Sequence, residues 1–128
     1  MRFQDNYTDW LADAFKNGVP DGVVAFTFNL YEQPKHEAPF GVELVGAGSF
    51  DPDGRDWAGD EVWEPAQGRN YDIPIVVSGK TWEKCLESMK RLLGRVMSDE
   101  TPVALRLRST KGVGVGFVDG EMFVLWAG

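Results

Sequence analysis

Apolar residues recur at helical spacing in two separate segments of the chain. The first segment carries Tyr7, Trp10, Leu11, Ala14 and Phe15. The second carries Trp82, Cys85, Leu86, Met89, Leu92, Leu93, Val96 and Met97. Spacings of three and four residues place each set on one face of a helix. The pattern therefore predicts a short amphipathic helix at the start of the chain and a longer one over 82–97, covering one face of a sheet.

Apolar and polar residues alternate with the period of a strand in the remaining segments. Residues 24–31 and 40–44 alternate on either side of a proline-containing connection, which predicts an antiparallel hairpin. Residues 73–77 predict a short strand, and the alternation of Val103, Leu105 and Leu107 predicts another. Residues 112–118 and 121–126 are joined by Asp119-Gly120, which favours the tight turn of a hairpin. The last quarter is thus predicted to be a three-stranded meander.

These elements together predict one α+β domain over residues 1–128. Their order is α-β-β-loop-β-α-β-β-β, with a mostly antiparallel sheet and the long helix packed on one face. A chain of 128 residues with 43% hydrophobic content suits one packed domain. No run approaches the roughly 18 apolar residues of a membrane span, and the first residues do not resemble a signal peptide. We therefore expect a cytoplasmic protein that does not bind membranes.

The charge of the chain is concentrated in one segment. The net charge of −7 disfavours nucleic acid and favours a basic partner. Residues 51–64 hold six acids and two tryptophans: Asp51, Asp53, Asp56, Trp57, Asp60, Glu61, Trp63 and Glu64. Such a loop is either pinned to the domain by its indoles or offered to a cationic, partly apolar partner. We interpret these eight residues as the partner-binding set, with Trp57 as the anchor in the partner and Trp63 as the more buried indole.

Two segments resemble known ligand-binding motifs but lack essential positions. Residues 78–81, Ser-Gly-Lys-Thr, look like the end of a phosphate-binding P-loop, but Pro74 stands where the motif needs glycine. Residues 51–56 resemble the opening of a calcium loop. That loop has Arg55 at its fifth position and Val62 at its twelfth, where calcium needs oxygen ligands. We therefore expect no cofactor and no bound metal.

The remaining candidates for catalysis have structural explanations. Cys85 lies on the apolar stripe of the predicted long helix, which is typical of a buried thiol. His36 lies in a polar loop, where a solvated side chain is the ordinary state. The single cysteine also excludes an intrachain disulfide and suits a reducing compartment. We expect no catalytic residue.

Glycine alternates with apolar residues in the segment after residue 111. Gly112, Gly114 and Gly116 fall on one face of the predicted strand. A stripe without side chains allows another backbone or a flat indole to approach the sheet closely. The alternative is a shallow groove for a small ligand over the same glycines. Both interpretations are open at the level of sequence.

Three stretches resemble the immunity proteins of bacterial polymorphic-toxin and secreted-effector systems. They are residues 48–57, 60–65 and 112–120, where acids, aromatics and glycines are concentrated. The resemblance implies a role, which is to bind a cognate toxin, often a basic nuclease or deaminase, and to block its site. The resemblance assigns no role to any individual residue of this sequence. Our hypothesis is a non-enzymatic immunity-type inhibitor, and the competing one is a small enzyme or ligand-binding domain that uses the glycine-lined sheet face.

Overall fold

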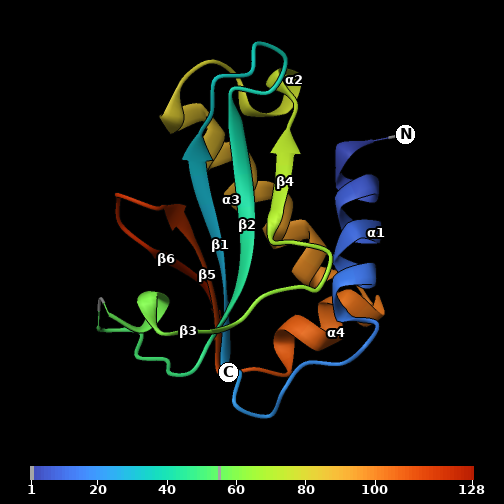
Figure 1. Cartoon of the computed structure of the whole chain (residues 1–128), viewed down its shortest axis with the longest axis vertical. Helices are drawn as coiled ribbons and strands as arrows, with labels where there is room; N and C mark the ends of the chain where they lie inside the picture. Colours follow the sequence, from blue (N-terminus) through green and yellow to red (C-terminus); the bar gives the residue numbers. More distant parts are fainter. Residues whose placement is uncertain (1, 55) are drawn as a thin grey trace.

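A mixed sheet organises the computed structural model, which describes residues 2–54 and 56–128 (Figure 1). Its strands are β1 (Ala25–Glu32), β2 (Phe40–Ala47), β3 (Glu61–Trp63), β4 (Asn70–Ile73), β5 (Gly112–Phe117) and β6 (Phe123–Ala127). The order across the sheet is β3-β2-β1-β5-β6, and β4 pairs with the opposite end of β2 from β3. All pairs are antiparallel except β1 with β5. The predicted hairpins β1–β2 and β5–β6 are confirmed.

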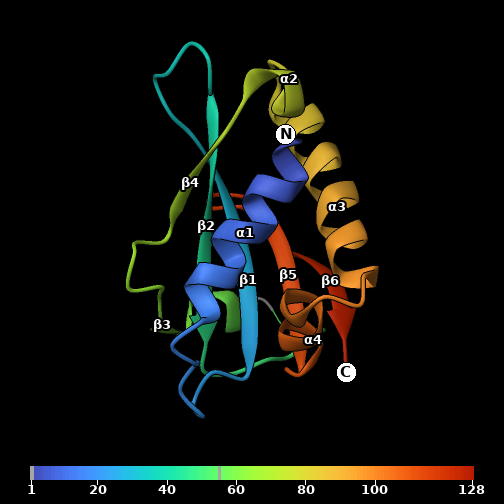
Figure 2. The ribbon, with the colours of Figure 1, turned by 90° about the vertical axis from the view of Figure 1, so that its right-hand side faces the viewer.

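Helices cover one face of this sheet. They are α1 (Phe3–Phe15), α2 (Ile75–Ser78), α3 (Trp82–Ser98) and α4 (Pro102–Arg108). Seen from the side, α3 runs along the sheet with α1 beside it (Figure 2). Alternate residues of β1, namely Phe26, Phe28 and Leu30, are fully buried beneath these helices. The α+β class and the helix-covered face are therefore as predicted.

The two long helices follow from their apolar stripes. Tyr7, Leu11 and Ala14 are the buried residues of α1. The buried residues of α3 are Cys85, Met89, Leu92, Leu93, Val96 and Met97. The Thr81 hydroxyl accepts a hydrogen bond from the Lys84 amide at 3.3 Å and caps the start of α3. Spacing and capping agree, and the predicted helices are confirmed.

The strand predicted over residues 103–107 is wrong, because this segment is the helix α4. The Thr101 hydroxyl accepts a hydrogen bond from the Ala104 amide at 3.1 Å, and Pro102 occupies the first turn. Both features start helices, and the helix buries Val103, Ala104 and Leu107 against α3 and α1. The last quarter is consequently a helix and a hairpin, and β5 enters the sheet parallel to β1.

The strand predicted over residues 73–77 is displaced. The observed strand β4 ends at Ile73, and the next residues form the single helical turn α2. Pro74 ends the pairing, because proline has no amide hydrogen to donate to a neighbouring strand.

No helix in the described part of the chain is long and apolar enough to cross a membrane.

Candidate functional site

The face of the sheet opposite the helices has a floor of small residues at one end. Gly112, Gly114 and Gly116 of β5 lie beside Ala25, Thr27 and Asn29 of β1, and β2 continues the face with Ala47, Val45 and Glu43. The segment between β2 and β3 folds back over the alanines and glycines. This segment contains most of the predicted acidic loop, whose last residues form β3, so the loop and the glycine stripe meet in one place.

Aromatic side chains of the segment between β2 and β3 lie directly on the glycines. A Cβ atom at Gly112 would be 2.1 Å from the Phe50 ring, and one at Gly114 would be 3.1 Å from the Trp57 ring. Phe50 and Trp57 meet edge to face, with centroids 4.7 Å apart. The structural interpretation of the glycine stripe is confirmed, because flat rings occupy the space that side chains would fill.

The prediction that Trp57 is the exposed indole and Trp63 the more buried one is wrong. Trp57 exposes only 5% of its surface and packs with Ala25 and Ala47. Trp63 is half-buried, and its ring contacts Phe26 and Phe15. Both indoles of the loop therefore pack within the domain, and the glycine floor decides which one is buried more deeply.

The six acids of the loop are all exposed, and several are held in place. The Asp51 carboxylate accepts a hydrogen bond from the Asp53 amide at 3.0 Å, which closes a tight turn. Arg69 donates to Glu64 at 2.7 Å and to Glu61 at 3.1 Å. These carboxylates, Glu64 foremost, raise the pKa of Arg69. The loop thus presents ordered carboxylates on a pinned backbone.

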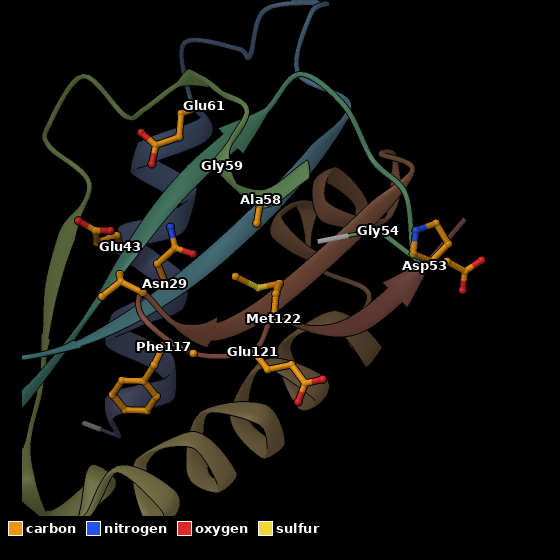
Figure 3. A pocket seen from close by; sticks show the side chains of 13 residues that line it. Asn29, Glu43, Asp53, Gly54, Ala58, Gly59, Glu61, Phe117, Glu121 and Met122 are labelled. Atoms are coloured by element: carbon orange, nitrogen blue, oxygen red, sulfur yellow. The ribbon is translucent and has the colours of Figure 1, made fainter. Parts of the chain in front are cut away.

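A groove of about 800 Å³ lies beside the loop on the same sheet face (Figure 3). Asn29 and Glu43, which are directly paired across β1 and β2, form its floor. Its walls and rim are formed by Ala58, Phe117, Met122, Asp53, Glu61 and Glu121, among others. Sequence analysis included Asp53 and Glu61 but missed Asn29, Glu43 and Glu121. The available signal was an asparagine in the middle of a buried strand.

Asn29 is the least solvated polar residue of this groove. It exposes 8% of its surface, and its side-chain amide makes no hydrogen bond to another described residue. Two residues earlier on the same strand face, the buried Thr27 hydroxyl has no partner among the described residues. Buried polar groups are normally paired, so this hydroxyl is an unusual feature of the sheet centre.

A second groove of about 530 Å³ surrounds the exposed Trp82. Trp82 was predicted on the buried stripe of its helix, but it is 52% exposed because it begins α3 at the edge of the core. Its ring meets Phe117 edge to face at 6.2 Å, and Val118 nearby is 60% exposed. Residues 117, 118, 120 and 121 line both grooves, so the β5–β6 turn separates them.

The residues considered for catalysis lie apart from both grooves. Cys85 is fully buried on α3, and desolvation raises the pKa of its thiol to about 12. His36 is exposed in the connection between β1 and β2. Within residues 2–54 and 56–128, no three His, Cys, Asp or Glu side chains are grouped to hold a metal ion. The described surface offers carboxylate and amide oxygens that can accept hydrogen bonds from cations, and it also offers apolar walls.

No protein-family model, curated protein or solved structure matches the chain. Comparison with known proteins therefore gives no family assignment, and function is inferred from the surface of the molecule.

Proposed function

We propose that the chain is a non-enzymatic binding protein, an immunity-type inhibitor that binds and neutralises a basic bacterial toxin in the cytoplasm. The observation that carries the proposal is an acidic loop whose backbone is fixed while its carboxylates are exposed. Trp57 is buried beneath the loop, and Arg69 holds Glu61 and Glu64. A surface ordered before binding loses little conformational entropy when a partner arrives.

The charge of this surface supports a basic partner. Asp53, Asp56 and Asp60 are exposed and form no ion pair with another described residue. Glu43 and Glu121 in the adjoining groove extend the negative surface. Nucleases and other enzymes of nucleic acids use basic surfaces to hold phosphates. An acidic inhibitor competes for such a surface and is attracted to it over distance.

Trp82 takes the place of Trp57 as the proposed apolar anchor. Its exposed indole lies beside Val118 and near the carboxylates of Glu32 and Asp119, which line the same groove. Tryptophans at the centre of an interface contribute strongly to affinity when a partner desolvates them. The proposed interface therefore runs from the acidic loop across the β5–β6 turn to the start of α3.

A second candidate is a small ligand-binding domain or enzyme. The groove over Asn29 and Glu43 favours it, because concave sites with a few convergent polar groups are typical of ligand binding. The glycines themselves are covered by Phe50, Trp57 and Met122. A ligand would therefore lie beside the glycine stripe.

The test measures how two variants, each with two charge reversals, bind the toxic protein that co-purifies with the chain. Asp56→Lys with Asp60→Lys alters the loop, and Asp9→Lys with Asp13→Lys makes the same change in charge on the exposed side of α1. Surface plasmon resonance at several salt concentrations should show association slowed about tenfold or more, with a flatter salt dependence, only for the loop variant. Equal effects of the two variants, or co-purification of no toxic protein, would contradict the proposal.

A further inference from the structure

We infer that the groove beside the acidic loop is a binding site for an organic cation, a guanidinium or primary ammonium group carried on an apolar stem. The floor of the site is the pair Asn29 and Glu43 at the centre of the sheet (Figure 3). The inference concerns the groove alone. It stands whether or not the exposed loop binds a toxin.

Asn29 indicates that the groove receives a polar ligand. Figure 3 shows its side chain rising from the strand into the groove, between Glu43 and Met122. The residue is 8% exposed, yet its amide has no hydrogen-bond partner among the described residues. A mostly buried amide whose polar atoms face the groove can donate and accept hydrogen bonds with a ligand held there.

Glu43 determines the charge of the preferred ligand. Asn29 and Glu43 are opposite residues of adjacent antiparallel strands, so their side chains leave the sheet next to each other. The amide oxygen and the carboxylate are then neighbouring acceptors. A guanidinium group presents several N–H donors in one plane and can satisfy both, and an ammonium group can do so with two of its three donors.

The rest of the lining strengthens the preference for a cation. Asp53, Glu61 and Glu121 add three carboxylates, and the described lining contains no lysine, arginine or histidine. Arg69 partly neutralises Glu61 from outside the groove. Ala58 and Met122 provide apolar walls for the stem that carries the cation. An anionic ligand would meet repulsion from every charged residue of the described lining.

The experiment is calorimetric titration of the full chain with three probes. N-acetylarginine amide represents an arginine of a protein partner, agmatine represents a free small cation, and N-acetylcitrulline amide is the neutral control. We expect the cations to bind at least about tenfold more tightly than the citrulline compound. Glu43→Gln, which keeps the side-chain shape, should weaken cation binding about fivefold or more, and Asn29→Leu should do the same. Asp9→Asn on α1 is the matched control and should bind as the wild type does.

The outcomes separate the source of the cation and test the site. Tighter binding of N-acetylarginine amide supports the site with a protein side chain as its ligand, and tighter binding of agmatine supports it with a small molecule. The inference is overturned if neither cation binds up to about 10 mM, if citrulline binds equally, or if Glu43→Gln leaves the affinity unchanged. Circular dichroism checks folding, and Glu43→Gln alone decides if Asn29→Leu does not fold. Asp56→Lys with Asp60→Lys, at two loop residues that do not line the groove, tests toxin binding separately.

Discussion

Single glycines on β5 determine how closely other parts of the chain approach the sheet. At Gly112 the neighbour of a Cβ atom would be a side chain, the Phe50 ring. At Gly116 it would be the backbone oxygen of Glu121, only 2.3 Å away. A backbone oxygen in a hairpin cannot rotate aside as a side chain can. The wall of the groove formed by the β5–β6 turn therefore depends on Gly116.

Two glycine-to-alanine substitutions should have opposite effects on stability. Gly116→Ala should lower the free energy of unfolding by about 1–3 kcal/mol, as overpacking does. Gly94 lies within α3 with open space around its Cβ position. Gly94→Ala should raise the free energy of unfolding by about 0.4–1 kcal/mol, because alanine restricts the unfolded chain. Urea denaturation measures both, and a Gly116→Ala protein as stable as the wild type would show that the hairpin can shift.

Two tryptophans, the buried Trp57 and the exposed Trp82, should separate stability from binding. Trp57→Ala should lower the free energy of unfolding by about 3–5 kcal/mol, because it removes a buried indole. Trp82→Ala should lower it by less than about 1 kcal/mol, because the side chain is half in solvent. If Trp82 is the anchor, its variant should weaken toxin binding by about 2 kcal/mol or more. A destabilised Trp82→Ala protein with unchanged toxin affinity would contradict both expectations.

At the scale of elements, α3 is stabilised by the burial of its apolar stripe, whereas α4 is determined by the residues at its start. Leu93 and Met89 lie in the continuous apolar face of α3, which packs against β5 and β6. In α4, a cap and a proline override three alternating apolar positions. Its arginines also tie it to the fold, since Arg106 donates to the Val19 carbonyl and Arg108 to the Met97 carbonyl. A cap makes its bonds within the helix itself, whereas a strand needs a neighbour in the sheet.

Matched leucine substitutions test this packing. Leu93→Ala should lower the free energy of unfolding by about 2–5 kcal/mol, because the residue is fully buried. Leu105 on α4 is 55% exposed, and Leu105→Ala should change the free energy by no more than about 0.5 kcal/mol. Urea denaturation of both proteins is the measurement. A loss below about 1 kcal/mol for Leu93→Ala would exclude the observed packing of α3.

At the scale of the whole molecule, the two faces of the sheet have different tasks. One face holds the apolar core beneath α1, α3 and α4. The other carries the acidic loop and the groove over Asn29 and Glu43. Cys85 belongs to the first face. Because its thiol is buried, the free energy of unfolding should depend on pH in the alkaline range. The carboxylates that we propose as ligand-binding groups lie on the second face.

Removal of Cys85 should change how stability depends on pH. Burial raises the pKa of the thiol from 9.0 to about 12, so on raising the pH the unfolded chain loses this proton before the folded chain does. The stabilisation is fully present below about pH 9 and is lost towards pH 12, by at most about 1.4 kcal/mol per pH unit. The difference in unfolding free energy between wild type and Cys85→Ala should therefore shrink as the pH rises above 9. If the unfolding free energies of the two proteins run parallel from pH 8 to pH 10.5, the raised pKa of the thiol is contradicted.

Local periodicity determined much of this fold in advance. The stripes of α1 and α3 and the alternation of β1 and β2 depend on neighbours along the chain, and the structure confirms them. The β5–β6 hairpin is also confirmed, but the tight turn predicted at Asp119-Gly120 is wrong. The Gly120 amide donates to the Phe117 carbonyl, and neither Asp119 nor Gly120 has a positive φ. In α4, the Thr101 cap and Pro102 start a helix despite the alternation of Val103, Leu105 and Leu107, which predicts a strand. A short period of two is ambiguous when the strand partner is unknown.

Only the tertiary structure decided which surface is available to a ligand. The sequence contained six acids and two indoles in the loop, but nothing local indicated that Trp57 would lie on glycines more than 50 residues away in the chain. The same holds for the exposure of Trp82 and for the pairing of Asn29 with Glu43. Burial and cross-strand pairing depend on how distant segments meet. The physical reason is that the hydrophobic effect acts on total exposed area and not on order along the chain.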